Sequence, residues 1–182
     1  MAEVVDLTEV QDDPPVIQLW VDMCPVAKPS VSFGPGRGTS GLWRRYIDTG
    51  VKNKMNQLKQ ITKTTMARMG MQKFPRRTPV VLKAWFFLRR PEDDFVGRRR
   101  GIGRLKESAA TMEETVVPIK ADIDNMGKFL LDALTGSLYE DDAQVVELHM
   151  FKLRDSEGLC EGRMAIECST FNSSSHEVMP KF

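Results

Sequence analysis

The sequence predicts a small α/β domain of the mixed α+β type, with a mixed sheet of about four strands packed by two main helices. Short runs rich in β-branched and aromatic residues lie at 16–23, 80–88, 143–153 and 163–168. Two segments, about 43–69 and 125–135, repeat apolar residues at helical spacing. The chain has 182 residues, 41% of them hydrophobic, which suffices for one core and not for two large domains.

The two ends of the chain are expected to lie outside this domain. Residues 1–15 are acidic and end in two prolines, and residues 169–182 are polar, so we expect a flexible arm, a domain over 16–168 and a flexible tail. Within the arm, Val4 to Thr8 resembles a SUMO-interacting motif, a short apolar strand beside acids. A disordered tail without a partner is the alternative interpretation.

Cysteine and histidine usage argues against a structural zinc site. The three cysteines form no C-x-x-C pair, and neither histidine has a partner at metal-ligand spacing, which favours a reducing compartment. No apolar stretch approaches the roughly 18 residues of a membrane span, and the start lacks a signal-peptide pattern. We therefore expect an intracellular protein without a membrane partner, nuclear in a eukaryote and cytoplasmic in a bacterium or phage.

The charge is unevenly distributed along the chain. Six acidic residues precede the first basic residue, Lys28, so the remaining 26 bases face 25 − 6 = 19 acids, a net charge of +7. A basic body favours polyanionic partners, although ordinary surface charge would give the same composition.

The segments between the predicted strands carry much of this basic charge. Residues 25–41 predict a loop that contains Lys28 and Arg37 and lacks the Gly-Lys-Ser/Thr of a P-loop. The predicted helix at 43–69 begins with Arg44 and Arg45. Residues 89–118 predict a flexible loop because three glycines disfavour a helix, and its arginines suit phosphate backbones or serve solubility: Arg98, Arg99, Arg100 and Arg104.

Two acidic motifs flank the second predicted helix. Asp122 and Asp124 are expected to point to one side of an extended segment, with Asp124 or Asn125 as the helix N-cap and Gly136 near the C-cap. The strand after the helix begins at Asp141 and Asp142. The spacing leaves open whether the two pairs converge; caps and turns are the alternative, and glycosyltransferases use a similar D-x-D pair.

Convergent carboxylates would select a hard cation, Mg²⁺ or Mn²⁺. Such a site, between a helix N-terminus and the following strand, suits phosphodiester hydrolysis. Lys128, one helical turn after Asp124, would then donate to a phosphate, or it would form only an i to i+4 salt bridge with that aspartate. Trp20, Trp43 and Trp85 fall at expected core positions, which disfavours base stacking as the main means of binding.

Residues 120–152 contain a D-x-D-N opening, a lysine one turn into a helix ending in D-A-L, and then D-D-A-Q-V-V. This pattern closely resembles the signature of RusA-type Holliday junction resolvases. A weaker likeness extends to PVAKPSVSFG near the start. Ala121 stands where many members have proline, and the Arg-rich stretch and the acidic arm look like additions to the compact domain.

The resemblance implies a homodimeric endonuclease that binds four-way DNA junctions and uses Mg²⁺ to nick two opposing strands symmetrically. It implies that Asp122, Asp124 and Asp142 are the catalytic, metal-binding acids, that Asp141 supports them, and that Lys128 is the essential lysine. The DNA arms would be held through phosphates by Lys28, Arg37, Arg44, Arg45, Arg98, Arg99, Arg100 and Arg104. Two alternatives are a junction-binding protein without catalysis and a nuclease for other branched DNA or RNA.

Overall fold

The computed structural model describes residues 16–27, 32–35, 43–46, 49–98, 104–110, 122–154 and 162–172. The side chains of 32–35, 43–46, 98 and 110 lie outside this description. The elements in chain order are β1 (Ile17–Val21), β2 (Ser32–Pro35), β3 (Trp43–Tyr46), α1 (Thr49–Arg68), β4 (Val80–Leu88), η1 (Glu92–Asp94), η2 (Val96–Arg98), α2 (Glu107–Ala110), α3 (Ile123–Leu134), η3 (Asp142–Gln144), β5 (Val145–Arg154) and β6 (Arg163–Thr170).

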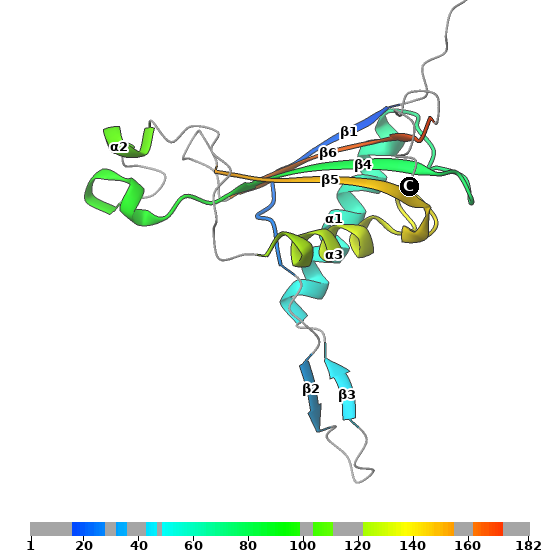
Figure 1. Cartoon of the computed structure of the whole chain (residues 1–182), viewed down its shortest axis with the longest axis horizontal. Helices are drawn as coiled ribbons and strands as arrows, with labels where there is room; N and C mark the ends of the chain where they lie inside the picture. The colour runs from blue at the N-terminus through cyan, green and yellow to red at the C-terminus, as the bar shows by residue number, and fades with distance from the viewer. Residues whose placement is uncertain are drawn as a thin grey trace, which may run out of the picture.

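Four strands form one mixed sheet in the order β1-β6-β4-β5, and β2 and β3 form a separate hairpin (Figure 1). β6 pairs antiparallel with both β1 and β4, whereas β4 and β5 are parallel. Parallel neighbours need a crossover connection, and α3 lies in this one. The predicted mixed α+β fold, with about four strands and two main helices, is confirmed.

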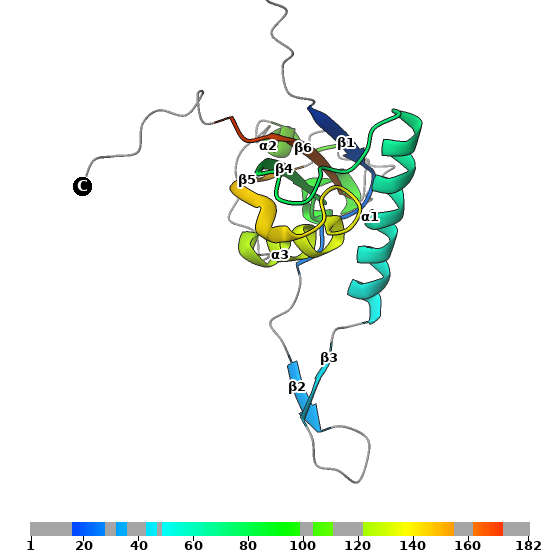
Figure 2. The same cartoon turned by 90° about the vertical axis from the view of Figure 1, so that its right-hand side faces the viewer.

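Both long helices, α1 and α3, cover the same face of the sheet (Figures 1 and 2). β1 shows why, because Ile17, Leu19 and Val21 are buried while the residues between them are exposed. On α3, Phe129 and Leu130 are fully buried against this face, as the helical spacing predicted. Each such side chain contributes roughly 2 kcal/mol by leaving water. Among the described helices, none has the length and apolarity required to cross a membrane.

The first third of the chain differs from the prediction. Residues 32–35 and 43–46 pair as antiparallel strands where a loop and the start of a helix were expected, and α1 begins only at Thr49. Trp43-Arg-Arg-Tyr46 carries aromatic residues that suit a strand, and pairing with β2 supplies backbone hydrogen bonds that outweigh weak helical periodicity.

The Arg-rich stretch is also more ordered than predicted. We call its described residues, 89–98 and 104–110, the basic module. Phe95 and Leu105 form an antiparallel bridge, and Phe95 is buried. Arg90, which is 1% exposed, donates to the Ala109 carbonyl at 3.0 Å, and Asp94 accepts from Arg154 at 2.8 Å. The buried Phe95 and the contacts of Arg90 and Asp94 therefore hold together a segment that its glycine content suggested was flexible.

Trp20 and Trp85 do not occupy the predicted core positions. Trp20 is 66% exposed, and Trp85 is only partly buried on the sheet face opposite the helices. The Trp43 side chain lies outside the described residues. The prediction failed because an apolar strand was assumed to be covered on both faces, whereas the described helices cover only one.

Candidate active site: an acidic pair at the start of α3

Asp122 and Asp124 lie together at the N-terminal end of α3. Asp122 is the N-cap residue and makes no side-chain capping bond, and Asp124 already belongs to the first helical turn. The sequence placed both in an extended segment and named Asp124 or Asn125 as the cap, so the helix starts earlier than predicted. Asn125 Nδ2 lies 3.5 Å from Asp122 Oδ2, a long contact. Both carboxylates are exposed to solvent.

Lys128 lies one turn along α3 and contacts Asp124. Its Nζ donates to Asp124 Oδ2 at 3.0 Å, and the two side chains are 62% and 63% exposed. This hydrogen bond from Lys128 lowers the pKa of Asp124 below its usual 3.8. The lowered pKa favours the ionised form of Asp124. The Lys128 ammonium is exposed enough to exchange this partner for a phosphate oxygen.

Asp141 and Asp142 begin the short 3-10 turn that leads into β5. Asp141 Oδ1 accepts from the Ala143 backbone at 2.9 Å, and Gln144 Oε1 accepts from the Asp141 backbone at 3.2 Å, which makes a reciprocal capping box. Asp141 thus caps the turn before β5; a turn before a strand was the alternative prediction for Asp141 and Asp142. Asp142 is exposed, with its carboxylate at the surface.

Gln144 is the residue of this region whose role sequence reasoning missed. It is 7% exposed, and its Nε2 donates to the carbonyls of Pro75 and Thr78 at 2.8 and 3.0 Å. These bonds fix the turn that carries Asp142 against the segment before β4. The partners lie more than 60 residues away in sequence, so no local pattern indicates them.

One protomer does not bring the two acidic pairs together. α3 has 12 residues, so its ends are about 18 Å apart at 1.5 Å per residue. Asp122 and Asp124 are at its beginning, and Asp142 follows the turn at its end. Among the described residues, no group of three or more acids, histidines or cysteines is placed to hold a metal.

A hollow of about 350 Å³ adjoins Asp141 and is lined by two arginines that the sequence did not single out, Arg76 and Arg77. Arg77 has a φ of 71°, the left-handed region that favours glycine. Both arginines are exposed. The hollow therefore carries positive charge beside Asp141.

The predicted DNA-binding residues are only partly described. Arg44 and Arg45 lie in β3, in the hairpin that projects from the helix side of the molecule (Figures 1 and 2). Arg98 ends η2, and Arg104 is exposed in the basic module, beyond one end of the sheet (Figure 1). The remaining four, Lys28, Arg37, Arg99 and Arg100, lie outside the described residues, as do Val4 to Thr8 and Ala121.

The comparisons with known proteins agree with the motif. Residues 25–163, about three quarters of the chain, match the family described as Endodeoxyribonuclease RusA. The comparison with curated proteins gave no match. The family match includes both acidic pairs, Lys128, α3 and the strands β4 and β5. The chain therefore belongs to the RusA endodeoxyribonuclease family, the family of RusA-type Holliday junction resolvases.

Proposed function

We propose that the protein is a magnesium-dependent endonuclease that resolves four-way DNA junctions by paired symmetric nicks, in recombination and repair. One observation carries this proposal: in a chain of this nuclease family, α3 presents two exposed carboxylates and a lysine on its first turns.

The acidic pair fits a hard divalent cation. Mg²⁺ is held in proteins by one or two carboxylates together with waters and substrate phosphate, and Asp122 and Asp124 are two exposed carboxylates. Mn²⁺ prefers the same oxygen ligands. When bound there, the ion would activate water and offset charge on the leaving oxygen.

The chain's own residues would prepare the phosphodiester. Asp124 is ionised at neutral pH, and the hydrogen bond from Lys128 lowers its pKa further below the usual 3.8. On DNA binding, the Lys128 ammonium would move from Asp124 to a non-bridging oxygen of the scissile phosphate and stabilise the charge that develops there. Water attacks phosphorus in line, its proton leaves to solvent, and the bond from phosphorus to the 3′ oxygen breaks. The products are a 5′-phosphate and a 3′-hydroxyl.

Basic elements on two sides would hold the DNA arms. The hairpin containing Arg44 and Arg45 and the basic module containing Arg104 extend in different directions from the body (Figure 1). Phosphate contacts of this kind select DNA by shape rather than by base sequence and weaken steeply with salt.

Asp142 is a separate part of the proposal. The resemblance assigns it to the metal, yet it lies at the far end of α3 from Asp124. A metal ligand and a turn residue respond differently to substitution, so the two roles can be separated. Asp142→Asn raises the Mg²⁺ concentration needed for half-maximal nicking if the carboxylate binds the metal, and leaves it unchanged if it does not.

The test is nicking of a fixed four-way junction by the wild type and Asp124→Asn, with binding measured separately. We expect paired symmetric nicks whose rate falls by at least about 100-fold in the variant, while junction affinity changes little. Asp22→Asn, the same change at an exposed aspartate after β1, serves as the control and should nick normally. Wild-type protein that binds the junction and never cuts at any Mg²⁺ or Mn²⁺ concentration would refute catalysis.

Flaps, forks and structured RNA tested in parallel address the second alternative. Faster cutting of any of these than of the junction would assign a different branched substrate. Because the acidic pair would still be needed, the same Asp124→Asn variant identifies the site for whichever substrate is cut.

A further inference from the structure

A short turn just before β4 carries two exposed arginines at its centre. The Thr78 backbone donates to the Pro75 carbonyl at 3.1 Å, which closes a β-turn whose central residues are Arg76 and Arg77. Pro75 opens the turn and Pro79 follows it, and each proline fixes its own backbone φ. The two arginines are therefore presented on a stiff stretch of backbone.

The second arginine of the turn has a conformation that arginine disfavours. Arg77 has a φ of 71°, and a positive φ at the third position of a turn is usually supplied by glycine or asparagine. Strained residues of this kind cluster at functional sites. Within the described ranges of the chain, neither the Arg76 nor the Arg77 guanidinium has an ion-pair or hydrogen-bond partner. The positive charge of the turn is therefore available to a ligand.

Side-chain and backbone contacts hold the turn in place. Gln144 Nε2 donates to the carbonyls of Pro75 and Thr78 at 2.8 and 3.0 Å, so one amide spans the turn. Just before the turn, the backbone of the buried Phe74 donates to the Leu138 carbonyl at 2.9 Å. A turn that is already ordered loses little conformational freedom when it binds a ligand, which favours affinity.

The two arginines line a hollow of about 350 Å³ that adjoins Asp141. At roughly 30 Å³ per water, this is the space of about ten waters, which leaves room for a phosphate group with bridging waters. The neighbouring acids have other partners: Glu140 pairs with Lys73 at 2.7 Å, and Asp141 accepts from the Ala143 backbone at 2.9 Å. The hollow therefore offers two cationic groups to an anion.

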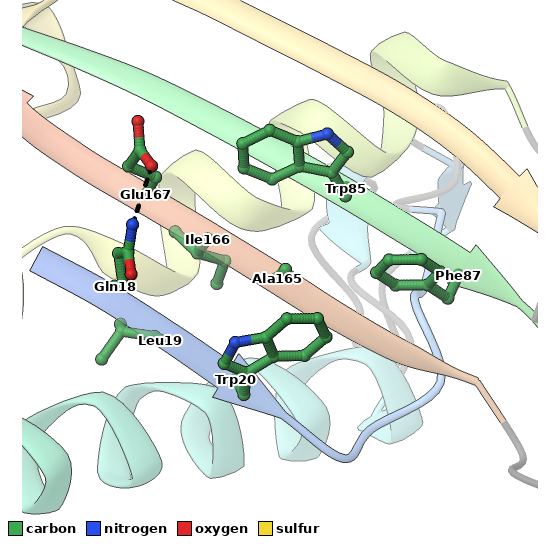
Figure 3. Close-up of a pocket in the computed structure, with 8 residues that line it drawn as sticks. All are labelled: Gln18, Leu19, Trp20, Trp85, Phe87, Ala165, Ile166 and Glu167. Carbon is green, nitrogen blue, oxygen red and sulfur yellow. Dashed lines mark hydrogen bonds between the residues drawn. The ribbon is translucent and has the colours of Figure 1, made fainter.

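A second hollow, of about 310 Å³, opens on the sheet face opposite the helices and has a different character (Figure 3). Its walls include the rings of Trp20, Trp85 and Phe87. Among its described lining residues only Glu167 is charged, and a carboxylate repels a phosphate. Of these two hollows, the one at the arginine turn is suited to an anion.

We infer that the turn of Arg76 and Arg77 is a binding site for a backbone phosphate of the DNA substrate. A guanidinium binds a phosphate through two parallel N–H donors, and both arginines are exposed to do so. The inference rests on the proposed function, which supplies DNA as the ligand. It adds a contact that lies outside the acidic motif and outside the basic segments considered so far.

The turn lies far from the basic module. β4 runs between them, and its nine residues at about 3.3 Å each separate the two by about 30 Å (Figure 1). The turn is also next to η3, which begins at Asp142, and so lies at the opposite end of α3 from Asp122 and Asp124. Phosphate contacts fix the orientation of DNA on a protein, and contacts this far apart would restrict its rotation.

The first experiment measures binding of a fixed four-way junction over a range of salt concentrations, without divalent metal so that no DNA is cut. The double variant Arg76→Gln/Arg77→Gln removes both charges. We expect the slope of log affinity against log salt to become shallower by about 1–2, because each phosphate contact contributes roughly 0.9. The control Arg68→Gln makes the same change at an exposed arginine in the last turn of α1, outside the hollow, and should keep the wild-type slope. An unchanged slope in the double variant overturns the inference.

Single variants at Arg77 separate the charge from the backbone conformation. Arg77→Lys keeps the charge and should bind the junction within about 3-fold of the wild type, because only the bidentate geometry is lost. Arg77→Asn suits the positive φ but removes the charge, and should bind about 10-fold more weakly. If the turn has only a structural role, Arg77→Asn binds as well as the wild type, and that result overturns the inference. Circular dichroism verifies that all variants fold.

Neutral replacement of single DNA phosphates locates the contact. A junction with an uncharged methylphosphonate at the contacted position should bind the wild type about 10-fold more weakly, yet bind the double variant no more weakly than the unmodified junction does. The absence of any such coupled position overturns the inference. Inorganic phosphate tests for a site that takes a free anion: if it shifts the arginine Nε–H signals in NMR spectra and the junction does not, the site does not bind DNA.

Failure of this inference and failure of the proposed function are distinguishable, because binding is measured without metal and does not depend on nicking. A shallower slope in the double variant of a protein that never nicks refutes the catalytic proposal and supports the phosphate site. An unchanged slope in a protein that nicks normally refutes the phosphate site alone.

Discussion

Gly127 determines how closely α3 approaches β5. It is buried in the first half of α3, and a Cβ added there would lie 2.6 Å from Met150 Sδ and 3.0 Å from Met150 Cε. Glycine in a helix interior costs about 1 kcal/mol relative to alanine. Gly127 therefore lowers the intrinsic stability of the helix that presents the acidic pair, but it allows the helix to pack closely against the sheet.

Gly127→Ala sets two effects of similar size against each other. The alanine gains about 1 kcal/mol of helix propensity, and overpacking against Met150 costs about 1–3 kcal/mol. The methionine thioether is flexible but packs against the core, so it moves only at some cost. We expect a net loss of stability of up to about 2 kcal/mol in the wild type.

Removal of the Met150 side chain should reverse the sign of the stability change caused by Gly127→Ala. In a Met150→Ala background the obstructing atoms are absent, and Gly127→Ala should stabilise the protein by about 1 kcal/mol. The difference between the two backgrounds is a coupling energy of about 1–3 kcal/mol. Urea unfolding of the four proteins at one pH measures it, with equal m-values required for a valid comparison. Additive effects within about 0.5 kcal/mol would show that Met150 does not limit the approach of α3.

Three further predictions concern the charged and capping groups. Lys128→Met should raise the pKa of Asp124 toward 3.8, because the hydrogen bond that lowers it is lost. In an NMR titration of the side-chain carboxyl groups, Asp124 should then protonate at a higher pH than in the wild type. An unchanged midpoint would contradict the contact between Lys128 and Asp124. Arg77→Gly should stabilise the fold by about 0.5–1 kcal/mol by relieving a positive φ, and should weaken junction binding with a shallower salt dependence. Thermal melts and filter binding check the two effects, and a lower melting temperature would count against the strain. Gln144→Ala should cost about 2–4 kcal/mol, because two backbone carbonyls at 2.8 and 3.0 Å lose their donor. A loss below about 1 kcal/mol in urea unfolding would show that water replaces the amide.

Sequence periodicity was sufficient to predict the helices and strands that have one apolar face or stripe. α3 and β6 show the expected spacing, because their buried residues recur at helical intervals in α3 and alternate in β6. Periodicity could not locate β2 and β3, because a two-stranded hairpin is set by pairing between segments rather than by a local pattern. Nor could it say which face of β4 remains uncovered, since Trp85 and its buried neighbours look equally apolar in sequence.

The site was predictable in its residue types and less so in its geometry. Asp122, Asp124 and Lys128 are grouped at one helix end because they are close in sequence, which the spacing expressed directly. The position of Asp142 depends on the length of α3 and on the turn that Gln144 anchors, and such long-range hydrogen bonds have no signature in a single sequence. For the same reason the basic module, whose order depends on Asp94, was predicted as a loop.

The order of strands in the sheet has a consequence for synthesis of the protein. β6, the last described strand in the chain, is the inner strand that separates β1 from β4. Until it emerges from the ribosome, β1 and β4 lack their shared neighbour and the core cannot close, so these contacts of long sequence separation form late. A domain built this way therefore completes its four-stranded core only after β6 has been made.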